Sequence, residues 1–80
     1  MQKYYQVNTI SKSAKPISKN RAHAKIWNRD FIPWYEDDEF VFVADCSEEP
    51  SDVKAVVLNV LKQFGKSFIK SAFYSDVCFD

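Results

Sequence analysis

Glycine is almost missing from this sequence, with Gly65 as its one occurrence in 80 residues. A phosphate-binding loop of the P-loop or Rossmann type needs several glycines, because its backbone must approach the phosphates closely. The sequence therefore excludes both nucleotide-binding motifs. Tight two-residue hairpins also favour glycine. We expect turns built from Asn, Asp, Ser and Lys, or longer loops.

Cysteine is scarce as well, and Cys46 and Cys78 are the two present. A small secreted domain normally carries four or more cysteines in a disulfide framework. We therefore expect buried, reduced thiols, although a single bridge between Cys46 and Cys78 stays open. Together with the lone histidine, His23, the cysteines do not have the spacing of a zinc site. We expect no metal and no other cofactor.

Long apolar runs are absent too. No stretch reaches the roughly 18 apolar residues of a membrane span, and residues 1–6 are too polar for a signal peptide. We expect a soluble, cytoplasmic protein that does not engage membranes. The aromatic fraction of 16% is high enough for a packed core. We therefore expect one folded domain over residues 1–80.

Acidic residues are missing from the first 29 positions. Seven of the 11 basic residues lie there, whereas the rest of the chain carries all 11 acids against four lysines. The zero net charge of the whole chain thus hides a polarised molecule, provided that the two parts reach different faces of the fold. Such polarity indicates electrostatic recognition of a partner.

One helix is predicted by a clear apolar stripe at about 51–64. The stripe consists of Val53, Val56, Val57, Val60, Leu61 and Phe64. Offsets of three, four, seven and eight residues are typical of a helix that packs on a sheet. Gly65 follows the last apolar residue, where a helix C-cap favours glycine.

Strands are predicted on both sides of this helix. Residues 39–45 are β-branched and aromatic on both faces, which is typical of a central strand. Residues 67–74 alternate as a final strand. The strand–helix–strand order predicts a parallel pair if both strands join one sheet. Residues 3–10 also read as a strand.

The segment between the first and the central strand is harder to interpret. Residues 11–20 are polar, contain Pro16 and are expected to form a loop, and residues 33–38 resemble a turn. For residues 21–31 we prefer a strand that pairs with residues 3–10 in a hairpin, but a helix capped by Ser18 stays open. The expected fold is α+β in the order β-β-β-α-β, with β-α-β-α-β as the alternative.

A basic segment with an aromatic residue is the first candidate site. It consists of Lys12, Lys15, Lys19, Arg21, Lys25, Trp27 and Arg29. Cations that follow phosphates, with aromatic faces on which bases stack, are typical of proteins that bind single-stranded nucleic acid. A lysine-rich solvated edge and a surface for an acidic protein stay open as alternatives. The isoelectric point near 6.6 argues against a dedicated nucleic-acid binder.

An acidic segment is the second candidate site. It consists of Trp34, Tyr35, Glu36, Asp37, Asp38 and Glu39. The spacing does not match a calcium-binding EF-hand loop. The carboxylates could instead mimic phosphates and occupy the cationic groove of a nucleic-acid enzyme, or they could form a solvated turn.

No catalytic pattern surrounds His23 or any serine, aspartate or cysteine. We therefore expect a non-enzymatic binding module that engages nucleic acid or a nucleic-acid-associated complex through its basic segment. The alternative is a small inhibitor of viral or mobile-element type that blocks a host nucleic-acid enzyme or defence complex by direct protein binding. Exposed strand edges are also compatible with a homodimer.

Overall fold

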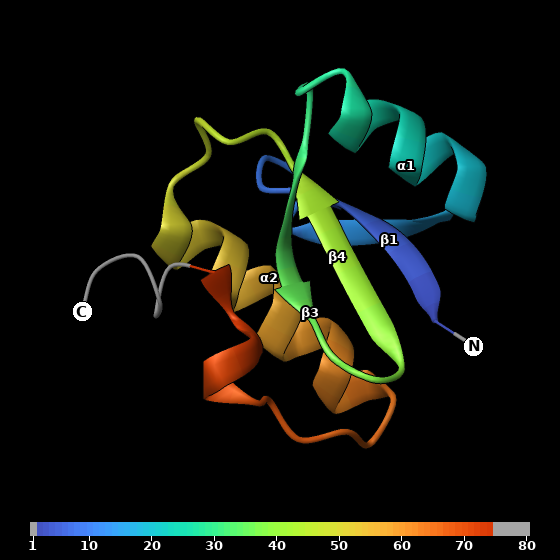
Figure 1. Ribbon diagram of the computed structural model, residues 1–80. Helices are drawn as coiled ribbons and strands as arrows, with labels where there is room; N and C mark the ends of the chain where they lie inside the picture. The colour runs from blue at the N-terminus through green and yellow to red at the C-terminus, as the bar shows by residue number, and fades with distance from the viewer. Residues whose placement is uncertain (1, 75–80) are drawn as a thin grey trace.

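Two β-hairpins, each followed by a helix, make up the fold in the computed structural model, which describes residues 2–74 (Figure 1). The elements in chain order are β1 (Lys3–Asn8), β2 (Ser13–Ile17), α1 (Lys19–Trp27), β3 (Ile32–Glu36), β4 (Phe40–Ala44), α2 (Pro50–Gln63) and the short 3-10 helix η1 (Lys70–Ala72). The expected α+β class, a small sheet with α2 as its main packed helix, is confirmed.

The strands form one mixed sheet in the order β2-β1-β4-β3. β1 and β4 lie side by side at its centre and run parallel, with Tyr4 opposite Val41. β2 and β3 pair antiparallel with them and form the two edges. The central strand predicted at residues 39–45 is thus confirmed as β4. The parallel pair joins the two hairpins. The sequence instead predicts a parallel pair between the two strands that flank the main helix.

α2 packs on one face of the sheet. Phe40 and Phe42 of β4 are buried there against Val53, Val57 and Leu61 of the helix. Burying each such side chain contributes about 1.5–3 kcal/mol, so this layer supplies most of the hydrophobic stabilisation. The predicted helix is confirmed, and it ends before Gly65, whose φ of 68° is the left-handed conformation of a helix C-cap.

α1 packs on the opposite face. Val41 and Val43 alternate with the phenylalanines of β4 and therefore point away from α2. They form a second, smaller cluster with Tyr4 and with the fully buried Ala22 of α1. α1 has nine residues and makes its main contacts with β1 and β3. Because α1 is short, β2 lies at the margin of the sheet face that α1 covers.

Residues 13–17 form an edge strand where the sequence predicts a loop. Pro16 lies opposite Tyr5 in the β1–β2 pair. A proline is tolerated at an edge, because its missing N–H can face away from the neighbouring strand. The prediction of a loop was wrong, since it treated Pro16 as a break rather than as the mark of an edge.

Residues 32–36 also form an edge strand where a turn is predicted. Pro33 again lies on an edge, and the register between β3 and β4 shifts between Pro33 and Tyr35. Such a bulge bends the strand and interrupts its alternating pattern. The true turn is limited to the residues between Glu36 and Phe40.

Residues 19–27 are helical, so the preferred strand for residues 21–31 was wrong and the helical alternative is confirmed. The hydroxyl oxygen of Ser18 accepts a hydrogen bond from the backbone N–H of Arg21 at 3.1 Å and caps the helix. A strand would bury Ala22 and Ala24 together. The structure buries Ala22 and exposes Ala24.

Residues 67–74 do not form the predicted strand. They contain η1 and one isolated bridge between Phe73 and Tyr35 of the β3 edge. Phe73 is fully buried and joins the core next to α2. The segment therefore meets β3 at that one bridge and adds no strand to the sheet, while Phe68 and Phe73 contribute to the core through packing.

Candidate functional site

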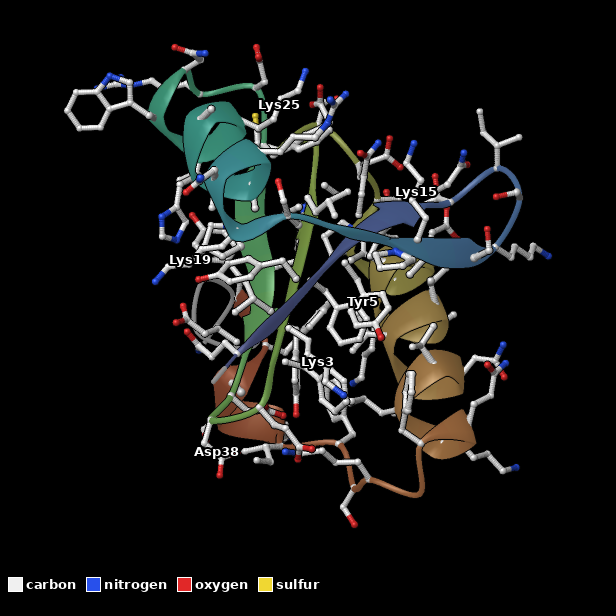
Figure 2. The ribbon with its side chains drawn as sticks, turned by 90° about the vertical axis from the view of Figure 1, so that its right-hand side faces the viewer. Lys3, Tyr5, Lys15, Lys19, Lys25 and Asp38 are labelled. Carbon is white, nitrogen blue, oxygen red and sulfur yellow. The ribbon has the colours of Figure 1, made fainter. Side chains whose placement is uncertain are left out.

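Most of the basic segment lies on the side of the molecule that carries α1, but Lys12, in the β1–β2 turn, lines a hollow with Asp52 and Asn59 of α2. Figure 2 shows Lys15, Lys19 and Lys25 around β2 and α1, with Asp38 at the opposite end of the view. Lys15 pairs with Gln6 and therefore lies on the face of the sheet that α1 partly covers. The fold thus brings the cations of β2 and α1 to the same face.

No cation of this segment forms an ion pair within residues 2–74. Every salt bridge in this part of the chain involves Lys66. Lys25 is half-buried, with its ammonium 5.7 Å from the centre of the Phe31 ring. The other cations of the segment, Lys12, Lys15, Lys19, Arg21 and Arg29, are exposed. Their charge is available to an external anion.

α1 carries its charges in an arrangement that does not stabilise an isolated helix. Its first turn has no acid but contains Lys19 and Arg21, next to the positive end of the helix dipole. Arg21 and Lys25 are four residues apart and therefore repel each other on one flank. The other flank carries His23 and Trp27, which also lie one turn apart. An anion bound beside α1 would relieve this repulsion.

Two cations of the segment have a backbone conformation that favours glycine. Lys12 has a φ of 56° and Arg29 a φ of 64°, and they are the two non-glycine residues with positive φ among those that the structure describes. Arg29 closes α1: its N–H donates to the carbonyl of Ile26, and the N–H of Asp30 donates to that of Lys25. This pattern is a Schellman cap, in which glycine is usual at the position of Arg29.

A shallow hollow lies at the end of α1 and is lined by His23, Ile26, Trp27 and Arg29. We call it the α1 hollow. Trp27 is 86% exposed. His23 is held by a hydrogen bond of 3.0 Å between its Nε2 and the hydroxyl of Tyr4, the second residue of β1. The hollow combines an open aromatic face with a basic rim.

The acidic loop (Glu36–Glu39) is organised by Asp37. Its Oδ1 accepts hydrogen bonds from the backbone N–H groups of Glu39 at 2.7 Å and Phe40 at 2.6 Å. Its Oδ2 accepts one from the hydroxyl of Tyr35 at 2.8 Å. Burial raises the pKa of Asp37, but these donors and the ammonium of Lys66 outweigh burial and hold the pKa below its ordinary value. Asp37 is a structural residue of the β3–β4 turn.

Lys66 partly neutralises the acidic loop. Its Nζ lies 2.9 Å from Glu39 Oε1, 3.2 Å from Asp38 Oδ1 and 3.5 Å from Asp37 Oδ2. The hydrogen bond to Glu39 is the main reason that the pKa of Lys66 is raised. The carboxylates therefore hold the segment after α2 against the sheet, which reduces the charge that they offer to a partner.

Trp34 and Tyr35 do not belong to an exposed surface. Trp34 is 3% exposed and donates its Nε1–H to the carbonyl of Asp45 at 3.1 Å, and Tyr35 is fully buried. Burial and the hydrogen bond to Asp37 raise the pKa of Tyr35 to about 12. The two aromatic members of the acidic candidate site are core residues. Of that segment, the carboxylates of Glu36, Asp38 and Glu39 remain accessible, whereas that of Asp37 is buried.

Metal-binding geometry is not found among residues 2–74, where no group of three His, Cys, Asp or Glu side chains could hold an ion. Cys46 is exposed and free, so the expectation of a buried thiol was wrong for this residue. It follows the end of β4 at Ala44, in a loop that projects beyond the sheet. Cys78 lies outside the described residues, as does its pairing with Cys46.

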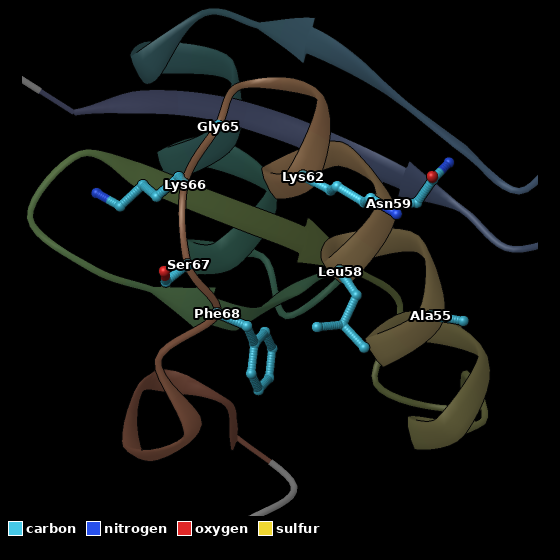
Figure 3. Close-up of a pocket in the computed structure, with 8 residues that line it drawn as sticks. All are labelled: Ala55, Leu58, Asn59, Lys62, Gly65, Lys66, Ser67 and Phe68. Carbon is cyan, nitrogen blue, oxygen red and sulfur yellow. The ribbon is translucent and has the colours of Figure 1, made fainter.

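A second hollow, which sequence reasoning missed, lies between α2 and the segment after it (Figure 3). We call it the α2 groove. It is lined by Ala55, Leu58, Asn59, Lys62, Gly65, Lys66, Ser67 and Phe68. The α2 members recur at helical spacing on a flank outside the core stripe. Leu58 was the available signal, because it is a large apolar residue that lies off that stripe.

In comparisons with known proteins, no family model, no curated protein and no solved structure matches this chain. Within residues 2–74, no helix is both long enough and apolar enough to cross a membrane.

Proposed function

We propose that this protein is a non-enzymatic module that binds nucleic acid through the cations of β2 and α1. The observation that carries the proposal is the contrast between the two charged segments. The cations of the basic segment have no ion-pair partner within residues 2–74, whereas three of the four carboxylates of the acidic loop share Lys66. Unpaired cations on one face are what contact with several phosphates requires.

The arrangement of α1 supports a polyanion as the partner. Lys19 and Arg21 lie at the positive end of the helix dipole, and Arg21 repels Lys25. An acid in the first turn would stabilise the helix more. These cations therefore lower the stability of α1 slightly, and a bound phosphate backbone would offset that loss.

The proposal is tested by fluorescence anisotropy of labelled single-stranded and duplex oligonucleotides at two salt concentrations. The variant Lys15→Gln/Arg21→Gln removes two exposed cations from the proposed surface. We expect weaker binding and a salt dependence reduced by roughly one counterion for each cation removed.

The matched control is Lys62→Gln/Lys70→Gln, which removes two exposed cations after the basic segment. If the protein attracted nucleic acid only through its net charge, the loss of two cations would weaken binding equally in both variants. Equal weakening, or no binding of the native protein at low salt, would contradict the proposal.

A protein inhibitor is the second candidate function, and the α2 groove is the observation that favours it. Leu58 is 41% exposed there, beside the half-buried Phe68. Exposed apolar side chains in a groove are typical of protein-binding surfaces. This candidate predicts that the native chain forms a stoichiometric complex with a partner protein and that the Leu58→Glu variant does not. Nucleic acid should compete with this partner protein rather than bind alongside it. Capture by both chains would contradict a role of the groove.

A further inference from the structure

Trp27 is exposed without a structural role among the described residues. It is 86% exposed and makes no hydrogen bond or ring contact within residues 2–74. Trp34, the other tryptophan, is 3% exposed and hydrogen-bonded. Leaving a large apolar ring in water forgoes the stabilisation of burial. Trp27 is therefore a candidate for contact with a ligand.

The α1 hollow around Trp27 has the chemistry of a base-stacking site. Arg29 supplies hydrogen-bond donors, His23 an imidazole ring and Ile26 apolar surface, and no carboxylate of residues 2–74 lines it. An indole face stacks on any base, and a neighbouring guanidinium binds the adjacent phosphate. The hydrogen bond between His23 and Tyr4 anchors this end of the hollow to the central strand.

Arg29 occupies its place in the hollow despite a strained backbone. Its φ of 64° is the left-handed conformation that glycine adopts more readily. Strained backbone positions persist only where the surrounding structure holds them in place, and they cluster at active sites and ligand-binding sites. Replacing the usual glycine by arginine puts a cation within the same hollow as the exposed indole.

We infer that the α1 hollow binds one unstacked base, so that the ligand is single-stranded nucleic acid or an unpaired stretch and not a regular duplex. In a duplex both faces of a base are covered by its neighbours, and an indole can stack only on a base that has left that arrangement. This inference rests on the proposed function, because the cations of β2 and α1 hold the phosphates while Trp27 favours single strands over duplexes.

The test compares a short labelled single strand with a duplex of the same sequence, using anisotropy and tryptophan fluorescence. The native protein should bind the single strand more tightly and lose emission as Trp27 stacks. Trp27→Ala should weaken single-strand binding about tenfold and leave duplex binding unchanged. Trp27→Phe should retain most of the affinity while its remaining tryptophan, the buried Trp34, is not quenched.

The outcomes separate this inference from the proposed function. If Trp27→Ala binds the single strand as tightly as the native protein while Lys15→Gln/Arg21→Gln does not, the stacking inference falls and the proposed function stands. Duplex binding as tight as single-strand binding also overturns the inference. If the native protein binds no oligonucleotide at low salt, both fall. Circular dichroism of each variant verifies that α1 remains folded.

Discussion

Lys12 and Arg29 show how single residues of this protein depart from what stability favours. Both have positive φ, and both belong to the basic segment. The turns of this glycine-poor chain are built from Asn, Asp, Ser and Lys as the composition predicts: Asn8 Oδ1 accepts from the N–H groups of Ile10 and Ser11 in the β1–β2 turn, and Asp37 has the same role between β3 and β4. Cations therefore occupy positions at which glycine is the unstrained choice.

Arg29→Gly should stabilise the protein and weaken its binding of nucleic acid. Relief of the left-handed conformation contributes about 1 kcal/mol, reduced by the greater freedom of glycine in the unfolded chain. Urea denaturation measures the free energy of unfolding, and anisotropy measures binding. The reciprocal control is Gly65→Ala: φ is 68° and no atom lies within 4 Å of an added Cβ, so any loss of stability comes from the backbone. A destabilised Arg29→Gly variant would contradict the argument.

Asp37 should make the stability of the protein sensitive to acid. The pKa of Asp37 is lower in the folded protein than its ordinary value of 3.8. The stability that its charged form contributes is therefore present above that value and is lost as the pH falls through the folded pKa. We expect Asp37→Asn to lower the free energy of unfolding near pH 7 by about 1–3 kcal/mol and to flatten its dependence on acidic pH.

The neighbouring Asp38 provides the control for this prediction. The side chain of Asp37 is 2% exposed and that of Asp38 is 90% exposed, although both contact Lys66. An exposed ion pair contributes at most about 1 kcal/mol. Denaturation curves of Asp38→Asn that shift as far as those of Asp37→Asn would show that the loop acts through its net charge and not through the buried hydrogen bonds of Asp37.

At the scale of elements, the two helices differ in what stabilises them. α2 buries a continuous apolar stripe, whereas α1 buries little beyond Ala22 and carries repelling cations. α2 is therefore part of the core, and α1 is a small element that displays side chains. This division explains why Lys19, Arg21 and Trp27 of α1 lie at the surface.

Substitutions within α2 should separate its core flank from its groove flank. Leu61 is 1% exposed and Leu58 is 41% exposed. Leu61→Ala should lower the free energy of unfolding by about 2–5 kcal/mol, because it leaves a cavity in the core. Leu58→Ala should cost under about 1 kcal/mol, because the site already contacts water. Thermal or urea denaturation distinguishes the two, and similar losses would contradict the assigned orientation of α2.

The elements also differ in how far their sequences predict them. α2 was predicted because its apolar period appears within one segment and does not depend on a partner. β2 and β3 were missed because Pro16 and Pro33 are compatible with a strand only at the edge of a sheet. α1 was ambiguous because Ala22 and Ala24 are small enough for either structure, and only packing exposes one and buries the other.

At the scale of the whole molecule, the parallel pair β1–β4 joins the two hairpins into one sheet. It places the acidic loop and the loop after β4 at opposite ends of the central strands. Glu48 of the second loop accepts a hydrogen bond from the hydroxyl of Thr9, at the end of β1. Carboxylates therefore lie at both ends of the central strands.

Hydrogen exchange should follow the order of the strands. β4 is buried along its whole length and lies at the centre of the sheet, whereas β2 is an edge of exposed and half-buried residues. Amides of β4 that are bonded to β1 and β3 should exchange only through global unfolding, and those of β2 through local opening. Faster exchange in β4 than in β2 would contradict the topology.

The sequence by itself determined the α+β class, the central strand at Phe40–Ala44, the helix α2 and the residues of the basic segment, because each of these depends on a pattern within one stretch of chain. Only the tertiary structure decided which of the charged segments is free. Lys66 lies 27 residues beyond Glu39 and reaches the acidic loop through the turn at Gly65. Burial likewise separates Trp27 from Trp34, because exposure depends on what the rest of the chain packs against each ring.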